Sequence, residues 1–348
     1  MKPYRTLFYL LLFAVFSGSC SKNRGTELKV LQLNIWMEAR NVPGAPDGVV
    51  DIVEQTDADV VLLCELNSGN EKPFTAWLVD ELKKRGKIYF NDGQRAGVGI
   101  LSKYALENTS LFFPSEERSR PILKAQLTVN GRTATVYSSH LDHRYYAPYL
   151  PRGYSEISWS KIDAPVSDAD AILAANRVAL RDESIKGFIE DAKSEIAKGH
   201  IVIVGGDLNE PSHLDWQQDT KDLRDHRGAV VNWDVSILLQ KAGYVDSYRR
   251  FYPNAVTHPG FTYPAGNVAA NLKSLHFASE ADERDRIDFI YYHPQAGVNL
   301  MEARIVGPAE SVCYGKISPE TSQDEFILPK GVWPSDHKGN LAVFRITD

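Results

Sequence analysis

The segment from Gly205 to Pro211 (GGDLNEP) holds residues well suited to chemistry. It follows Ile201 to Val204, an apolar, β-branched run that is typical of a buried strand. Side chains two apart in an extended segment share a face, so we expect Asp207 and Asn209 to present a carboxylate and a carboxamide together at a sheet edge. The paired glycines would let a ligand approach the backbone closely. Asp, Asn and Pro also form ordinary turns, so this segment alone does not establish a site.

Other apolar strand patterns in the chain also end on, or contain, a polar residue. A buried charge is costly unless it is paired or bound to a metal. One such residue is ordinary, whereas its recurrence along one chain indicates a site. The residues that recur in this way are Asn34, Glu65, His140, Asp288, Asp336 and His337.

This ordered set, together with Asp207 and Asn209, resembles the endonuclease/exonuclease/phosphatase family. The resemblance covers nearly all of the chain after its N-terminal segment, and it depends on the order of short motifs. It implies a four-layer α/β sandwich, in which two mainly antiparallel β-sheets pack face to face with helices outside. It also implies metal-dependent hydrolysis of a phosphate ester.

By this resemblance, a divalent metal ion would be held by Asn34, Glu65 and Asp336. Mg²⁺ prefers hard oxygen ligands and retains several waters, which suits these side chains, and Mn²⁺ is an alternative. Zinc fits less well, because the histidines lack a tight ligand spacing and asparagine is a poor zinc ligand. The sequence has no phosphate-binding loop of the Gly-Lys-Ser kind and no nucleophile elbow, so it supports neither a P-loop nucleotidase nor a covalent hydrolase.

The resemblance also implies roles for the remaining residues. Asp207 would orient or deprotonate the attacking water, and Asn209 would hold the phosphate or Asp207. His337 would contact a phosphoryl oxygen, with Asp288 fixing its tautomer and charge. His140 would donate a hydrogen bond to the phosphate or the leaving group. Whether Asp207 or His337 is the base stays open, because strongly coupled groups titrate together.

The elements that must position these residues alternate between strand and helix patterns. Strand patterns occur at 28–36, 59–66, 98–102, 122–129, 133–139, 201–204, 286–293, 298–306 and 340–345. Helix patterns occur at 49–56, 72–85, 167–198 and 235–242, and the dipeptide at 130–131 predicts a hairpin turn. We expect one catalytic domain over residues 28–348, in which Cys64 and Cys313 could form a disulfide.

A loop between residues 143 and 166 lacks a regular pattern and is rich in aromatic residues. It begins directly after His140, so we expect it to overhang the site and to stack on a sugar, a base or a quaternary ammonium group. The alternative is a surface loop that packs on itself. The segment 257–264 is expected to supply a second wall. The aromatic residues of the loop are Tyr145, Tyr146, Tyr149, Tyr154 and Trp159.

The formal net charge of -6 argues against a dedicated nucleic-acid binder, because neutralising a polyanion needs clustered Lys and Arg. We therefore expect a monomeric phosphodiesterase or phosphatase that acts on a small or lipid-linked substrate. Water would attack the phosphate in line with the leaving group. The alternative is a nuclease, for which DNA or RNA would be a substrate and not a binding partner. A lipoprotein that binds glycans or lipids without catalysis is a remoter alternative, which the intact acidic and histidine set disfavours.

Residues 1–19 have the features of a signal peptide, since basic residues precede an apolar run at 7–16 and small residues then precede Cys20. Small residues before a cysteine resemble a bacterial lipobox, which implies cleavage before Cys20 and lipid attachment to it. Residues 20–27 would then tether an exported protein to the cell envelope, at its periplasmic or outer-membrane face. Simple secretion and a retained membrane anchor are the alternatives.

We predict that Cys20 is the lipidated first residue of the processed protein. The substitution Cys20→Ala removes the lipid acceptor, so the variant should leave the membrane fraction while the unchanged protein sediments with membranes. Cell fractionation and mass determination of the N-terminus measure this. A variant that stays with the membranes and keeps its original N-terminus would show that residues 1–19 are not a cleaved signal peptide.

Overall fold

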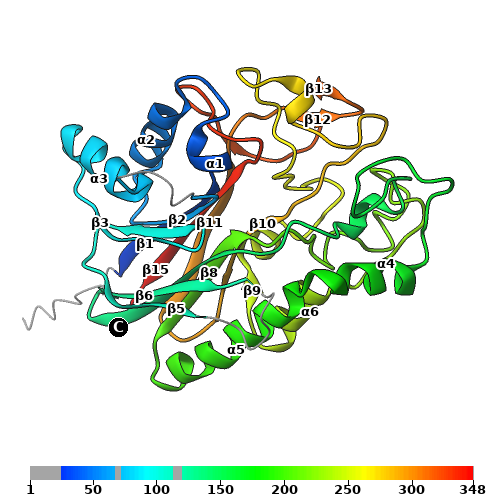
Figure 1. The fold of residues 1–348 in the computed structure, drawn as a ribbon. Helices are drawn as coiled ribbons and strands as arrows, with labels where there is room; N and C mark the ends of the chain where they lie inside the picture. Colours follow the sequence, from blue (N-terminus) through cyan, green and yellow to red (C-terminus); the bar gives the residue numbers. More distant parts are fainter. Residues whose placement is uncertain (1–24, 67–71, 113–119, 348) are drawn as a thin grey trace, which may run out of the picture.

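The computed structural model describes residues 25–66, 72–112 and 120–347, which form two large β-sheets with helices on their outer faces (Figure 1). The predicted signal peptide and Cys20 lie outside the described residues. Within the described ranges, each helix is too short or too polar to cross a bilayer.

The first sheet has the strand order β14-β11-β15-β1-β2-β4-β3, and the second has the order β5-β6-β7-β8-β10-β9. Most neighbouring strands are antiparallel, and the pairs β1–β2, β7–β8 and β11–β14 are parallel. The strands of the first sheet are β1 (Thr26–Asn34), β2 (Val60–Cys64), β3 (Phe90–Arg95), β4 (Val98–Ser102), β11 (Val298–Val306), β14 (Phe326–Ile327) and β15 (Gly339–Ile346). Those of the second are β5 (Glu107–Phe112), β6 (Ile122–Val129), β7 (Arg132–His140), β8 (Ile201–Asp207), β9 (Val245–Asp246) and β10 (Asp288–Tyr292). A separate ribbon pairs β12 (Ser311–Cys313) with β13 (Lys316–Ser318).

The helices follow the strands in chain order. They are α1 (Trp36–Ala39), α2 (Ala45–Thr56), α3 (Phe74–Lys84), α4 (Ala169–Asn176), α5 (Arg181–Ala197), α6 (Asp234–Lys241) and α7 (Ser247–Phe251). Short 3₁₀ turns are η1 (Ala147–Tyr149), η2 (Arg177–Ala179) and η3 (Leu272–Ser274).

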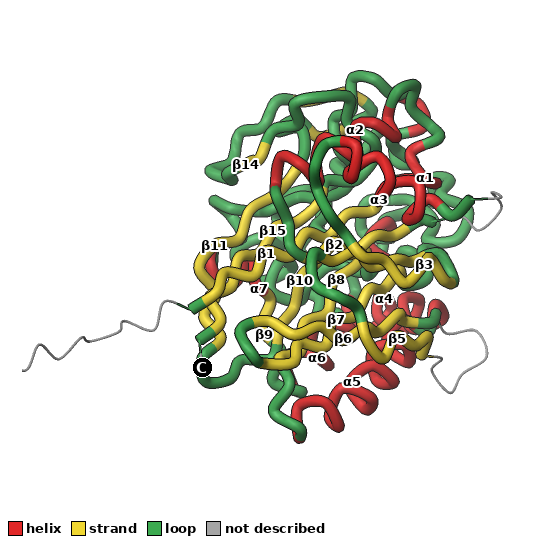
Figure 2. Tube along the Cα trace, turned by 90° about the vertical axis from the view of Figure 1, so that its left-hand side faces the viewer, coloured by secondary structure: helices red, strands yellow, loops and turns green. Residues whose placement is uncertain are grey.

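Three apolar layers hold the sheets and helices together. The inner layer lies between the sheets, where Leu28 and Val30 of β1 share one buried cluster with Ile201 and Ile203 of β8. A second cluster lies between the first sheet and helices α2 and α3, and a third lies between the second sheet and helices α5 and α6. Figures 1 and 2 show these helices on opposite outer sides of the paired sheets. The predicted α/β sandwich is confirmed.

The alternation of β1 directs its side chains to two different layers. Leu28 and Val30 face the second sheet, whereas Leu31 belongs to the outer cluster beneath the helices. The period of two puts Gln32 and Asn34 in the inward row, and both side chains are fully buried. The inward row of β1 therefore changes from apolar to polar at one end of the sandwich.

The second sheet follows the same rule. In β8 the residues Ile201 and Ile203 face the inner layer, and Asp207 ends that row. Strand β10 runs antiparallel to β8 with Asp288 opposite Asp207, and the parallel register of β7 puts His140 beside Asp207. Polar residues of β1, β7, β8 and β10 thus gather at the same end of the inner layer.

The prediction of one continuous helix at 167–198 is wrong in one respect. The structure has two helices there, α4 and α5, separated by a 3₁₀ turn and by Leu180 in the left-handed region at φ 56°. The break lets Arg181 begin α5 with its side chain buried. The sequence pattern did not reveal the break, because tertiary contacts of Arg181 override helix propensity there.

Those contacts attach the aromatic loop to the fold. The guanidinium of Arg181 donates to the carbonyl oxygens of Asp142, Arg144 and Tyr145 at 2.6, 2.9 and 2.9 Å. It also lies 3.6 Å from the buried carboxylate of Glu210. One buried arginine therefore joins the beginning of the loop to the GGDLNEP segment.

Several strands were not predicted from the sequence. Strands β3 and β5 are the outermost strands of their sheets, and β5 is half-buried or exposed along its length. An edge strand with solvent on one side needs no apolar alternation, so its sequence carries a weak signal. The strands that carry the polar residues were predicted, because they are buried.

Cys64 and Cys313 are buried free thiols, so the disulfide that the sequence allowed does not form. The Cys64 thiol donates to the carbonyl oxygen of Ser139 at 3.1 Å, and its sulfur accepts the backbone N–H of Asp207 at 3.4 Å. Burial raises the pKa of Cys64 well above its usual value. Cys64 therefore links the two sheets as a neutral thiol directly beneath Asp207.

Gly206 of β8 lies too close to β7 for any side chain. A Cβ atom at this position would be 1.9 Å from the carbonyl oxygen of Ser139. We predict that Gly206→Ala lowers the free energy of unfolding by at least about 2 kcal/mol, because β7 and β8 must move apart. Gly131→Ala is the control, since its Cβ would meet nothing within 4 Å and its φ of 72° costs only roughly 1 kcal/mol. Equal losses in urea unfolding would contradict the close approach of the strands.

Candidate active site

The polar end of the sandwich opens into a cavity of about 650 Å³. This volume is typical of a small-molecule site. Six of the sequence-predicted site residues line it, namely Glu65, His140, Asp207, Asn209, Asp336 and His337. The other two, Asn34 and Asp288, are fully buried and hydrogen-bond to residues of that set.

Asn34 joins two of the carboxylates. Its amide nitrogen donates to Glu65 Oε1 at 3.1 Å and to Asp207 Oδ2 at 3.0 Å, while its Oδ1 accepts the backbone N–H of Trp36 at 2.9 Å. Because its nitrogen faces the two carboxylates, Asn34 positions them, and its oxygen is directed to the backbone N–H of Trp36. Its expected role as a metal ligand stays a prediction.

Glu65 is held by a run of left-handed residues that we did not expect. All four residues of α1 (Trp36–Ala39) have φ between 42° and 60°, and Glu65 itself has φ 60°. This geometry directs the backbone N–H of Met37 to Glu65 Oε2 at 3.0 Å. Left-handed turns of L residues are costly, and they occur where the surrounding structure enforces them. The turn thus fixes the orientation of the Glu65 carboxylate.

His337 is positioned by Asp288, as the resemblance implied. The two side chains approach to 2.8 Å between Nδ1 and Oδ2, and Gln32 donates to the other oxygen of Asp288 at 2.9 Å. Asn340 completes the group by donating to Gln32 Oε1 at 3.1 Å. Burial disfavours a charged imidazole, but attraction by Asp288 and Asp207 outweighs it and raises the pKa of His337 well above its usual value.

Asp207 lies between the two histidines. Its Oδ2 is 3.7 Å from Nε2 of His140 and 3.9 Å from Nε2 of His337. Burial and the negative charge of Asp288 raise the pKa of Asp207 to about 8. Burial lowers the pKa of His140 to about 4, so at neutral pH this imidazole is uncharged. The two histidines therefore differ in charge although both face one carboxylate.

The acidic groups suit a divalent cation. Burial raises the pKa of Asp336 to about 7, as it raises that of Asp207, and a bound cation would favour the ionised form of both carboxyl groups. Ligand atoms of Asp207, Asp288 and His337 lie within 4.8 Å of one another and form a second candidate set. Because Asp288 and His337 already bind each other, Glu65 and Asp336 are the more available oxygen donors.

Asn209 does not share an extended segment with Asp207 as predicted. Asn209 has φ 49°, and its backbone N–H donates to Asp207 Oδ1 at 2.8 Å. Its side chain donates to the carbonyl oxygen of Leu141 at 3.0 Å. A tight turn thus replaces the extended geometry, and Asn209 positions Asp207 through the backbone.

The aromatic loop lines the cavity in part. Tyr146, Tyr149 and Trp159 are among its lining residues, whereas Tyr145 and Tyr154 are not. Tyr146 Oη donates to Asp285 Oδ2 and Tyr149 Oη to Glu283 Oε2, both at 2.8 Å. The loop therefore both packs on the protein and faces the site. Of the second predicted wall at 257–264, Tyr263 lines the cavity and packs against the imidazole of His337, with ring centroids 4.9 Å apart.

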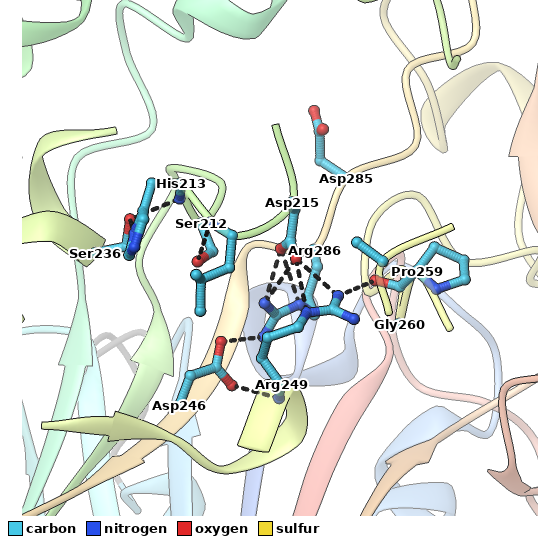
Figure 3. Close-up of polar contacts among 12 residues, drawn as sticks. Ser212, His213, Asp215, Ser236, Asp246, Arg249, Pro259, Gly260, Asp285 and Arg286 are labelled. Atoms are coloured by element: carbon cyan, nitrogen blue, oxygen red, sulfur yellow. Dashed lines mark hydrogen bonds and ion pairs between the residues drawn. The ribbon is translucent and has the colours of Figure 1, made fainter. Parts of the chain in front are cut away.

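A buried ion cluster adjoins the segment 257–264, to which Arg249 donates hydrogen bonds. It is formed by Asp215, Asp246, Arg249 and Arg286 (Figure 3). Arg286 Nη1 donates to Asp246 Oδ2 at 2.7 Å, and the guanidinium groups of Arg249 and Arg286 both contact Asp215. Each charge has a partner, as burial requires. The cluster fixes Arg286 two residues before Asp288, and so holds the beginning of β10.

Sequence reasoning missed several residues of the site. Gln32 and Asn340 hold Asp288, and Arg120, Phe277 and Trp36 line the cavity. Gln32 had a detectable signal, because it interrupts the apolar inward row of β1 two residues before Asn34. Arg120 and Phe277 lie in irregular segments, whose position relative to the site no local pattern reports.

Comparison with known proteins identifies the family. A model described as "Endonuclease/Exonuclease/phosphatase family" matches residues 31–337. The chain belongs to this family. Members of the endonuclease/exonuclease/phosphatase family are phosphoester hydrolases that generally depend on a divalent metal ion, so this chain is a phosphoester hydrolase with an acidic site suited to such an ion.

Individual relatives are distant. "Uncharacterized protein F14F9.5" of Caenorhabditis elegans is 24% identical over 300 residues, which cover 82% of this chain and 85% of that protein. The structure of D. rerio TDP2 complexed with single strand DNA product has a TM-score of 0.52 at 17% identity, covering 92% of this chain and 99% of the other. A functionally unknown conserved protein from Enterococcus faecalis V583 has a TM-score of 0.51 at 16% identity, covering 92% and 100%. At these identities the structures show the fold alone.

We predict that Glu65→Ala, Asp207→Ala and His337→Ala each lower turnover at least about a hundredfold without unfolding the protein. Each variant removes an ionisable group from the cavity, where it stabilises charge or transfers a proton. Asp219→Ala, which changes an exposed aspartate, is the matched control. The rates of hydrolysis and the circular dichroism spectra measure this, and normal turnover of folded Asp207→Ala protein would remove Asp207 from the mechanism.

Proposed function

We propose that this family member hydrolyses a small or lipid-linked phosphate ester by attack of water in line with the leaving group. The observation that carries the proposal is an aromatic wall beside the catalytic residues, formed by Tyr146, Tyr149, Trp159 and Phe277. Among the described lining residues, Arg120 is the only lysine or arginine. A polyanion such as DNA is bound through many cations, whereas an aromatic wall suits a compact group.

The proposed metal is Mg²⁺, with Mn²⁺ as the alternative. Glu65 and Asp336 would hold it, since both offer carboxylate oxygens to the cavity. When bound, the ion would supply positive charge to the phosphate oxygens and to the leaving group. Asn34 would hold the carboxyl groups of Glu65 and Asp207 in fixed positions relative to each other, because its amide nitrogen donates to both.

Asp207 is our choice for the base that orients and deprotonates the attacking water. Burial raises its pKa to about 8, and a bound cation would favour the ionised form that a base requires. His337 has its pKa raised by Asp288 and Asp207 after burial is overcome, so it is protonated at neutral pH and serves as a charged donor to a phosphoryl oxygen. His140, uncharged because burial lowers its pKa to about 4, would donate a neutral hydrogen bond to the phosphate or the leaving group. Asn209 would hold Asp207 in place through its backbone N–H.

We further propose that the enzyme acts as a monomer at the cell envelope, anchored by lipid on Cys20. This location is inferred from the signal-peptide pattern and the small residues before Cys20. An anchored enzyme would meet lipid-linked substrates at the membrane surface.

Removal of metal should abolish activity. Hydrolysis of bis(p-nitrophenyl) phosphate should stop after exhaustive treatment with EDTA, because without the metal ion the anionic phosphate would be repelled by the acidic groups of the site. Mg²⁺ or Mn²⁺ should restore it. Release of nitrophenol measures both steps. Full activity in the chelated protein would exclude the metal-dependent mechanism.

A substrate panel tests the choice of ester. We expect a higher kcat/KM on small or phospholipid esters than on duplex DNA, because a polyanion requires many cations and Arg120 is the only lysine or arginine among the described lining residues. The panel compares plasmid DNA, phospholipids and phosphosugars under equal metal and salt. Cleavage of plasmid DNA at catalytic enzyme concentration, with no turnover of the other esters, would favour the nuclease alternative.

A further inference from the structure

Behind the aromatic wall lies the carboxyl group of Glu283, which forms no ion pair of its own within the described part of the chain. The guanidinium of Arg152 also acts on it, but Arg152 is paired with Asp285. Glu283 is fully buried, and among the described residues it has no ion-pair partner. The neighbouring acids of the segment 280–285 are all paired: Glu280 with Lys161, Asp282 with Arg284, and Asp285 with Arg152. An unpaired buried charge is costly, so its retention beside a binding cavity points to a ligand that supplies the missing charge.

Glu283 is directly attached to the cavity wall. Its Oε2 accepts the hydroxyl of Tyr149 at 2.8 Å and the backbone N–H groups of Phe277 and Ala278 at 3.1 Å each. Its Oε1 is buried and has no hydrogen-bond partner. Burial raises the pKa of Glu283, the three donors to Oε2 oppose this rise, and a cation in the cavity would favour the ionised form further. Both Tyr149 and Phe277 line the cavity, so the charge lies immediately behind the rings.

The wall presents aromatic rings rather than hydroxyl groups. Tyr146 and Tyr149 pack edge to face with centroids 5.1 Å apart, and Trp159 packs on Phe277 with centroids 4.2 Å apart. The hydroxyls of Tyr146 and Tyr149 already bind Asp285 and Glu283, so neither is available to a polyol. Phe277 is 45% exposed, which leaves part of its ring open to a ligand.

We propose that this wall is a binding site for an ammonium group, and that the substrate is a phosphate ester of an amino alcohol. The proposal rests on the proposed hydrolase function. The negative faces of aromatic rings attract a cation, and the Glu283 carboxylate behind them adds to this attraction. An anionic group would be repelled by the same carboxylate. A nucleobase would gain stacking energy but would leave Glu283 without its counter-ion.

The experiment compares choline with 3,3-dimethylbutan-1-ol, a neutral molecule of the same shape. Binding to the full chain is measured by ligand-observed NMR, with no substrate present, and by inhibition of bis(p-nitrophenyl) phosphate hydrolysis. We expect choline to bind at least about tenfold more tightly, as a cation–π site with a carboxylate requires. Equal affinity for the two molecules would overturn the proposal, because the wall would then be only an apolar surface.

Variants identify the charge responsible. Glu283→Gln removes the charge but keeps an acceptor for Tyr149, so the preference for choline should fall to less than about threefold. Glu195→Gln is the matched control: Glu195 is also buried, but it binds Lys124 on the outer side of the second sheet, and its variant should keep the preference. An undiminished preference in folded Glu283→Gln protein would overturn the assignment.

The substitution Phe277→Leu tests the proposal independently, in case the Glu283→Gln protein does not fold. Phe277→Leu keeps an apolar side chain at this position but removes the ring, so choline should bind at least about fivefold more weakly while the neutral alcohol changes little. Equal weakening of both ligands would overturn the proposal. Choline binding without hydrolysis of any ester would instead count against the proposed function and leave the ammonium site standing.

Discussion

Water is excluded from the layer between the two sheets, and every polar group that ends an inward row there must therefore find a partner within the protein. Asn34 satisfies two carboxylates at once, and Asp288 is enclosed by Gln32, Asn340 and His337. These hydrogen bonds make the site a continuation of the core. Burial raises the pKa values of Asp207 and Asp336, and a bound cation would favour the ionised form of both carboxyl groups.

The site is also built on unfavourable backbone geometry. Left-handed residues occur in α1 (Trp36–Ala39), at Glu65 and at Asn209. Trp36, Met37, Glu65 and Asn209 line the cavity, and Glu38 hydrogen-bonds to Glu65. Each such residue costs roughly 1 to 2 kcal/mol, and together they direct N–H groups toward Glu65 and Asp207. The surrounding apolar clusters must hold these turns in place, so core packing and the orientation of the carboxylates are energetically linked.

The sequence was informative where burial dictates residue type. Asn34, Glu65 and Asp207 were predicted at strand ends and Asp288 within a strand, because a polar residue interrupts an apolar row there. The four-layer sandwich was predicted from the family resemblance. Local patterns could not report the break before Arg181, because its cause is a set of bonds to a loop distant in sequence.

The aromatic wall was predicted only in part for the same reason. Trp159 was expected near the site, but the contribution of Phe277 depends on how a second loop is held by Glu283. Tyr145 looked equivalent to Tyr146 in the sequence, yet only Tyr146 lines the cavity. Loop side chains have no fixed period, so their direction follows from tertiary contacts.

The inward-facing rows of β1 and β8 contain both core residues and site residues, and this affects how the enzyme reaches its native state. If β1 paired with β2 one residue out of register, Leu33 would take the inward position of Asn34, and Asn34 would turn toward the helices. A misaligned sheet could still be compact, but it would be catalytically dead. Recovery of turnover after denaturation should therefore report correct strand alignment more strictly than recovery of secondary structure does.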